Sequence, residues 1–131
     1  MMSERYWKVH RKITPEPGAV PIDFFGLPNG ASRSALFVID ELPEKARTWL
    51  YLEMTDVDAP REAMIFVNDT GPLPAPDGIV SGSMRKSAVL EVPAGHFRSG
   101  RNEVRFVFDN LNGGTSGFLV DVAAILVDAP R

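Results

Sequence analysis

The residues best suited to hold a polyhydroxylated ligand fall in the second half of the chain, and they are Asn68, Asp69, Asp77, Arg85, Asp109, Asn110 and Asn112. Carboxylate and amide oxygens accept hydrogen bonds from vicinal hydroxyls, and a guanidinium donates two bonds in a fixed geometry. Glycines at 113, 114 and 117 would let backbone amides approach such a ligand closely. The plainer alternative is that Asn, Asp and Gly stand here because they are turn residues.

A second group of candidates is aromatic. If Leu50, Leu52 and Met54 face a core, then Trp49, Tyr51 and Glu53 point outward from the same strand. A neighbouring strand could add Arg105 to that face. An exposed Trp and Tyr beside charged groups can stack on the apolar face of a sugar ring. The alternative is that Trp49 lies under the N-terminal segment, with Tyr51 at its edge.

Catalytic chemistry finds little support in the sequence, which therefore predicts a protein that is not an enzyme. The absence of cysteine removes disulfides, thiolate catalysis and most zinc sites. The histidines are His10 and His96, one on an expected strand and one in an expected turn. The Gly113–Gly117 segment precedes a strand rather than a helix, so it is no phosphate cradle. A pair of acids for glycoside hydrolysis stays open, since the 17 Asp and Glu residues always offer pairs.

Charge and hydropathy limit the partners. A net charge of −3 argues against nucleic acid and anionic membrane surfaces as partners. No apolar run is long enough to span a bilayer, and residues 1–9 have no apolar core of a signal peptide. Two compartments follow as alternatives: cytoplasmic if the chain is complete, or extracellular if it is a module of a longer secreted protein.

Period-two alternation predicts strands over 6–13, 34–40, 62–68, 87–92, 102–109 and 118–127, with 22–25 docking on the core. The stretch 42–54 fits a helix or a strand, and a strand from about Thr48 is favoured because its neighbours are strands. We expect a long loop over 69–86 and a turn over 96–100. With 11 Gly and 11 Pro, residues 1–131 are predicted to form one all-β antiparallel sandwich.

Strand direction then sorts the loops. If the strand ending at Asn68 runs up, the next three run down, up and down in turn. The loops 69–86 and 110–117 would share one end of the sandwich, and the turns 55–61 and 93–101 the other. This convergence is the argument for a site that combines Asn68 and Asp69 with Arg85, Asp109, Asn110 and Asn112.

Three phrases follow one another in a recognisable order: Leu50–Asp56 with Ile65–Asn68, then Leu90–Pro93 with 97–100 and Asn102–Val104, then Gly117–Val122. Together they resemble the galactose-binding-domain-like jelly roll, the sandwich of many non-catalytic carbohydrate-binding modules and of the sugar-binding domain in family 2 glycoside hydrolases. The resemblance covers about Ser34 to Val127. Asp69 stands where a glycine is usual, which requires Asp to adopt a positive φ.

The resemblance implies a non-catalytic module that binds a polysaccharide or oligosaccharide beside an adjoining catalytic domain. It also implies a possible structural calcium, with Asp121 matching the aspartate of the last strand that can serve as its ligand. Asp121 could equally be a hydrogen-bonded acid. The alternative function is a structural or protein-interaction sandwich that braces a neighbouring domain or an oligomer without a ligand of its own.

Overall fold

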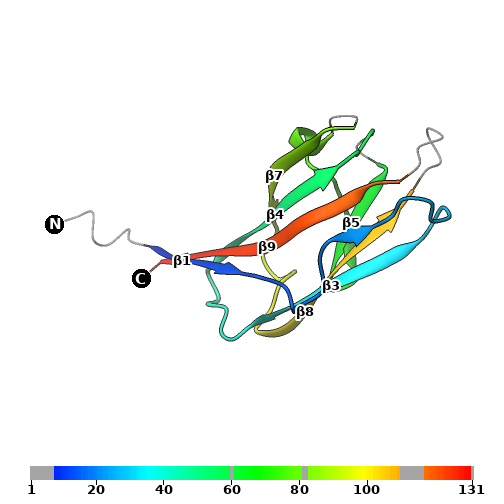
Figure 1. Cartoon of the computed structure of the whole chain (residues 1–131). Helices are drawn as coiled ribbons and strands as arrows, with labels where there is room; N and C mark the ends of the chain where they lie inside the picture. The colour runs from blue at the N-terminus through cyan, green and yellow to red at the C-terminus, as the bar shows by residue number, and fades with distance from the viewer. Residues whose placement is uncertain (1–7, 60, 81–82, 110–116, 131) are drawn as a thin grey trace.

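The computed structural model describes residues 8–59, 61–80, 83–109 and 117–130 (Figure 1). Its strands are β1 (Lys8–Ile13), β2 (Ile22–Asp23), β3 (Ser32–Ile39), β4 (Arg47–Thr55), β5 (Ala63–Val67), β6 (Thr70–Pro74), β7 (Arg85–Val92), β8 (Gly100–Phe108) and β9 (Leu119–Pro130). A single 3₁₀ turn, η2 (Asp77–Ile79), is the one helical element of these residues. No helix of the described part could cross a membrane.

The strands form two antiparallel sheets that face each other (Figure 1). Sheet A has the order β1-β9-β4-β7, with β2 pairing on the β1 side of β9. Sheet B has the order β3-β8-β5-β6. The longest pairing holds β9 against β4, and the pairings of β8 with β3 and of β7 with β4 are next and equal in length. The predicted all-β antiparallel sandwich is confirmed.

Alternation along the central strands builds the core between the sheets. In β4 the residues Leu50, Leu52 and Met54 are completely buried, and in β8 the residues Val104 and Phe106 are too. Their neighbours in sequence point to the outer faces, because side chains on a strand alternate. The stretch that fitted either a helix or a strand is a strand from Arg47 to Thr55, because only a period of two buries this set.

Aromatic rings close the core at the end where β9 begins. Phe118 stacks on Phe24 with ring centroids 4.5 Å apart and meets the edge of Phe108 at 6.0 Å. Gly117 makes this contact possible, because a Cβ added there would lie 2.3 Å from the carbonyl oxygen of Phe24. The resemblance to "Gly-Phe" at this point therefore has a packing reason: the glycine admits a backbone and the phenylalanine fills the core.

The prediction of a loop over 69–86 is wrong for its first residues. The error changes the end of the sandwich at which the later loops were expected. Residues 70–74 form β6, which pairs with β5 through a tight turn at Asn68-Asp69. The chain therefore crosses the sandwich once more before β7 begins. In addition, β5 runs antiparallel to β8, with Ala63 opposite Phe108 and Val67 opposite Val104.

Two ends of the sandwich follow from these registers. The Asn68 end holds the β5–β6 turn and the turn 93–99, since the Asn68 amide donates to the Glu103 carbonyl. The Arg85 end holds the turn 56–62, the start of β7 and the two sides of the loop after β8, since Asp109 donates to the Glu62 carbonyl. The expectation that the loops 69–86 and 110–117 lie at one end is wrong for Asn68 and Asp69, but it holds for the part that leads into Arg85, which lies at the same end as Asp109. The expectation that the turns 55–61 and 93–101 share an end is wrong.

Candidate functional site

The polar residues predicted to converge are split between the two ends. Asn68 and Asp69 lie at the Asn68 end, whereas Arg85 and Asp109 lie at the Arg85 end. Asn110 and Asn112 lie outside the described residues, and Asp77 belongs to η2. Sequence reasoning failed here because a missed strand changes the end at which every later loop is placed. The ligand-binding role of each residue stays a prediction.

The Asn68 side chain has a structural role in this fold. Its side-chain nitrogen donates to the His96 carbonyl at 2.7 Å and to Asn102 Oδ1 at 2.9 Å. Its side-chain oxygen accepts the Glu103 amide at 2.9 Å. Asn102, only 1% exposed, accepts the Arg98 amide at 2.9 Å. We call the side chains of Asn68 and Asn102 the amide clamp, because together they tie the β5–β6 turn to the turn before β8.

Asp69 is the exposed partner of this turn. Asn68 and Asp69 have φ values of 49° and 64°, so both adopt the left-handed conformation of a two-residue hairpin turn. The expectation that Asp69 meets a positive φ where glycine is usual is confirmed. Its side chain is 81% exposed and lies 3.7 Å from Arg105.

The aromatic pair occupies the position expected of it. Trp49 and Tyr51 point outward from β4, the third strand of sheet A, and each is partly exposed. The expected addition of Arg105 to this surface is wrong, since Arg105 lies on β8 in sheet B, with its guanidinium 4.4 Å from the centre of the Phe66 ring. The neighbours of β4 are β7 and β9, which supply other side chains. We call the outer surface of sheet A around Trp49 and Tyr51 the aromatic face.

A shallow depression borders Trp49 on the aromatic face. It has a volume of about 410 Å³ and is lined by Arg11, Lys12, Trp49, Leu126, Val127 and Asp128. Leu126 is the β9 residue opposite Trp49, and Lys12 is the β1 residue opposite Leu126. On the other side the Arg47 guanidinium lies 5.1 Å from the centre of the Trp49 ring and pairs with Glu91 at 3.0 Å. The indole is therefore held among charged side chains.

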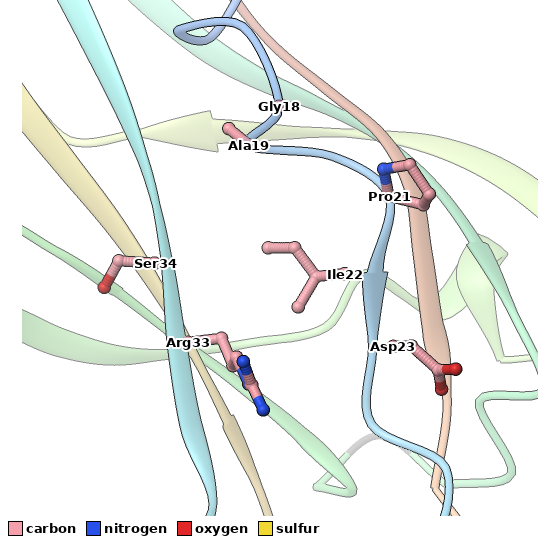
Figure 2. A pocket seen from close by; sticks show the side chains of 7 residues that line it. All are labelled: Gly18, Ala19, Pro21, Ile22, Asp23, Arg33 and Ser34. Carbon is pink, nitrogen blue, oxygen red and sulfur yellow. The ribbon is translucent and has the colours of Figure 1, made fainter.

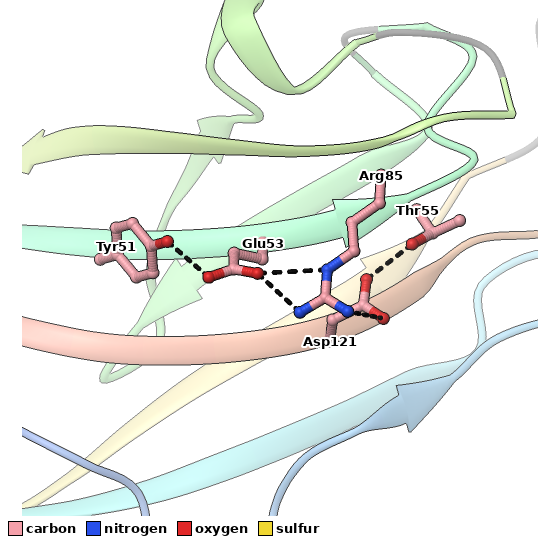
Figure 3. A network of polar contacts seen from close by, with 5 residues as sticks. All are labelled: Tyr51, Glu53, Thr55, Arg85 and Asp121. Carbon is pink, nitrogen blue, oxygen red and sulfur yellow. Dashed lines mark hydrogen bonds and ion pairs between the residues drawn. The ribbon is translucent and has the colours of Figure 1, made fainter.

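Tyr51 begins a chain of polar contacts that runs along the aromatic face to the Arg85 end (Figure 3). The phenol donates to Glu53 at 2.5 Å, and the other Glu53 oxygen accepts two bonds from Arg85, at 2.6 and 3.1 Å. Arg85 also lies 3.8 Å from Asp121, which accepts the Thr55 hydroxyl at 2.7 Å. We call these residues the face network: Tyr51, Glu53, Thr55, Arg85 and Asp121.

A β-bulge brings Asp121 into the face network. Glu53 pairs with Val122, but Met54 pairs with Val120, so Asp121 is an extra residue in β9. Such a bulge redirects a side chain that regular alternation would point inward. The sequence gives little sign of it, since Val120 to Val127 reads as an apolar run with one acid.

The hydrogen bonds of the face network move the pKa of its acid and the pKa of its phenol further from neutrality. The bond from Tyr51, followed by those from Arg85, holds the pKa of Glu53 below its ordinary value. The bond to Glu53 raises the pKa of Tyr51, and desolvation and the Glu53 charge act in the same direction. At neutral pH the face thus presents a neutral phenol, an ionised carboxylate and a guanidinium.

The surroundings of Asp121 do not fit the calcium that the resemblance implies. Its carboxylate already receives the Thr55 hydroxyl and faces the Arg85 guanidinium. A calcium ion there would compete with a fixed positive charge and needs several more oxygen ligands. Among the described residues, no group of three His, Cys, Asp or Glu side chains is placed to hold a metal.

The open edge of the sandwich holds another pocket that sequence reasoning missed (Figure 2). It has a volume of about 420 Å³ and lies between β2 and β3, with Gly18 and Ala19 at one end. The Ile22 side chain points into it and Arg33 projects from β3, whereas Asp23 points away (Figure 2). Asp23 caps its own turn by accepting the Phe25 amide at 2.8 Å.

No protein-family model matches this chain, and no curated protein matches it. Solved structures do. A family 86 glycoside hydrolase in complex with neoagarooctaose matches with a TM-score of 0.71 and 12% identity, over 92% of this chain and 18% of the hydrolase. A β-porphyranase of the same family from the human gut bacterium Bacteroides plebeius matches with a TM-score of 0.65 and 16% identity, over 95% of this chain and 21% of the enzyme.

A family 35 carbohydrate-binding module from an environmental isolate matches over nearly its whole length. The TM-score is 0.50 and the identity 16%, over 91% of this chain and 96% of the module. The chain thus spans about a fifth of the two hydrolases and almost all of the module. At these identities the likeness concerns the fold, and it confirms a galactose-binding-like, jelly-roll β-sandwich.

Proposed function

We propose that this chain is a non-catalytic carbohydrate-binding module that holds a glycan on the aromatic face of sheet A. The observation that carries the proposal is the outward alternation of Trp49 and Tyr51 on β4, beside the depression along β9 and β1. The fold shared with a family 35 carbohydrate-binding module supports it.

The chemistry of the aromatic face suits a sugar ring. The apolar side of a pyranose packs on an indole or phenol, and its hydroxyls need donors and acceptors around the edge of that contact. Lys12 and Asp128 border the Trp49 depression, and Glu53 and Arg85 follow Tyr51. Because Arg85 and Tyr51 already hold Glu53 in place, little side-chain entropy is lost when a ligand binds there.

We further propose that the module serves a neighbouring catalytic domain that acts on a polysaccharide. Two family 86 glycoside hydrolases contain a part with this fold that covers about a fifth of their length. A module that holds the polymer raises its effective concentration at an attached active site. The role is accessory, with no catalysis by this chain.

The test is binding of the protein to a panel of plant, algal and bacterial polysaccharides, measured by affinity gel electrophoresis. Trp49→Ala and Tyr51→Ala should each weaken retention by roughly tenfold, because each removes one stacking surface. Phe25→Ala is the matched control, since Phe25 is an aromatic residue that is 40% exposed and lies away from the aromatic face, in the turn after β2. All variants should keep the circular dichroism spectrum of the parent protein.

The loops at the Arg85 end provide the competing location. Asp109→Ala tests that end, with Asn110→Ala and Asn112→Ala beside it. If these variants lose retention and Trp49→Ala does not, the glycan lies on the loops. If no polysaccharide retains the parent protein, the proposal fails and the structural or protein-interaction alternative gains support. Val89, 50% exposed opposite Tyr51, would then be part of a protein contact.

A further inference from the structure

A second polar pocket lies on the outer side of sheet B at the Asn68 end, in the sheet opposite the aromatic face. It has a volume of about 340 Å³. Leu36, Asp69, Arg98, Arg101 and Glu103 line it together with the amide clamp. We call it the arginine pocket.

The backbone that carries its two arginines is held rigidly. Asn102 Oδ1 accepts the Arg98 amide, and Asn102 Nδ2 donates to the Arg98 and Gly100 carbonyls at 2.8 and 3.0 Å. Arg98 Nε donates to the Arg101 carbonyl at 3.1 Å. Arg98 in the turn and Arg101 at the start of β8 therefore both extend from a fixed backbone, which lowers the entropy lost when they bind a ligand.

The guanidinium groups of Arg98 and Arg101 lack an anionic partner within the described residues. Arg98 uses Nε for a backbone carbonyl, which leaves its two terminal nitrogens available. Arg101 has no hydrogen bond or ion pair from its side chain in the described part of the chain. Elsewhere on the surface Arg47 and Arg85 both have carboxylate partners.

The two carboxylates of the arginine pocket are engaged in other directions. Glu103 accepts the Ser34 hydroxyl at 2.8 Å. Asp69 lies 3.7 Å from Arg105, which is a third cation beside the pocket. The pocket and its border therefore hold two carboxylates and three guanidinium groups. This surface carries an excess of positive charge, which a bound anion would neutralise.

We infer that the arginine pocket binds the anionic substituent, a sulfate ester or a carboxylate, of an acidic glycan. Guanidinium groups match the paired oxygens of both anions. Asp69 and Glu103 can accept hydrogen bonds from the hydroxyls beside that substituent, and Leu36 offers an apolar contact to the ring. The inference rests on the proposed function for the glycan, and it adds a site on the opposite sheet.

The experiment uses ¹H–¹⁵N spectra of the arginine side chains, titrated at constant ionic strength. The probes are glucose 6-sulfate, glucuronate, glucose and sodium sulfate. The Nε–H signals of Arg98 and Arg101 should shift with glucose 6-sulfate or glucuronate, and glucose should bind at least roughly tenfold more weakly. Arg101→Gln should weaken binding of the acidic sugar by about tenfold, and Asp69→Asn should strengthen it by removing an opposing charge.

Arg33→Gln is the matched control, since Arg33 is also exposed and lines the pocket between β2 and β3. Equal binding of glucose and glucose 6-sulfate would overturn the inference, as would an equal loss in Arg33→Gln. Sodium sulfate binding as tightly as glucose 6-sulfate would reduce the site to an adventitious ion only. If Trp49→Ala no longer binds the acidic sugar and Arg101→Gln still does, the aromatic face alone binds glycan. If Arg101→Gln no longer binds it and Trp49→Ala still does, the result supports the arginine pocket and counts against the aromatic face.

Discussion

The amide clamp and the face network are both built from polar side chains that join three strands or turns, yet they have opposite surroundings. The clamp lies between the sheet B hairpin and the turn before β8, and Asn102 is 1% exposed. The network lies on the outside of sheet A, where the Arg85 side chain is 55% exposed. The clamp stabilises the fold, whereas the network reaches solvent mainly through Arg85, and we propose that a ligand can contact it there.

Burial is what separates the two roles. When one partner of a buried hydrogen bond is removed, water cannot reach the polar group that remains. That group then keeps its whole desolvation penalty. A bond lost on the surface is replaced by water, and an exposed ion pair adds little to stability. Asparagine at 68 and arginine at 85 were equal candidates for ligand binding by residue type alone, and their surroundings make them different.

The largest expected effect comes from breaking the clamp at its buried centre. Asn102→Ala removes the acceptor of Arg98 N–H and both donors to the turn, so we expect a loss of about 3 kcal/mol in the free energy of unfolding. Urea denaturation followed by circular dichroism measures it. A loss below about 1 kcal/mol would contradict the structural role assigned to the clamp. The control is Glu91→Gln, an exposed polar change on sheet A.

The next prediction separates the two residues of the β5–β6 turn. Both have positive φ, so glycine suits the backbone at each position. Asn68→Gly removes the clamp side chain, and we expect a loss of about 1–2 kcal/mol. Asp69→Gly removes only an exposed side chain and a long ion pair, and we expect a change within about 0.5 kcal/mol. Equal losses would mean that the turn, and not the clamp, determines stability here.

The sequence predicted the fold because alternation in β4, β8 and most of β9 is regular. Leu50, Leu52 and Met54 allow only one buried face, and that fixes the outward position of Trp49 and Tyr51. The jelly-roll fold was predicted from the order of the sequence segments that contain Asn68, Asn102 and Gly117. Each of these residues has a structural reason to be where it is, either in the clamp or at the Phe24 contact.

The candidate site was less predictable, for two physical reasons. Residues 70–74 contain two prolines, which argue against a strand because proline has no backbone N–H to donate. An edge strand tolerates them, because the backbone on its outer side pairs with no other strand. Missing β6 placed Asn68 and Asp69 at the wrong end. The bulge at Asp121 depends on the pairing of β9 with β4, which a single sequence does not reveal.

A smaller effect is expected when the face network is broken at Glu53. The bond to Glu53 is the main cause of the raised pKa of Tyr51, so Glu53→Gln should bring that pKa back toward the ordinary value. The chain has 2 tyrosines, which makes a spectrophotometric titration easy to resolve. Arg85→Gln should change the melting temperature little. An unchanged titration in Glu53→Gln would mean that the phenol is not held by this carboxylate in solution.

The smallest expected effect concerns the Arg47–Glu91 pair beside Trp49, where more than half of each side chain is exposed. The hydrogen bond from Arg47, followed by its charge, holds the pKa of Glu91 below its ordinary value. A lowered pKa in the folded state means that the stabilisation is present above the unfolded pKa and disappears as the pH falls through the folded one. Arg47→Gln should therefore melt slightly below the parent protein at pH 7 and together with it at pH 2. Arg33→Gln, which has no carboxylate partner among the described residues, should show no such convergence. The clamp contains no group that titrates between pH 7 and pH 2, so Asn102→Ala should melt below the parent protein at both pH values. If its melting temperature also met that of the parent at pH 2, the contrast between the buried clamp and the charged surface would be lost.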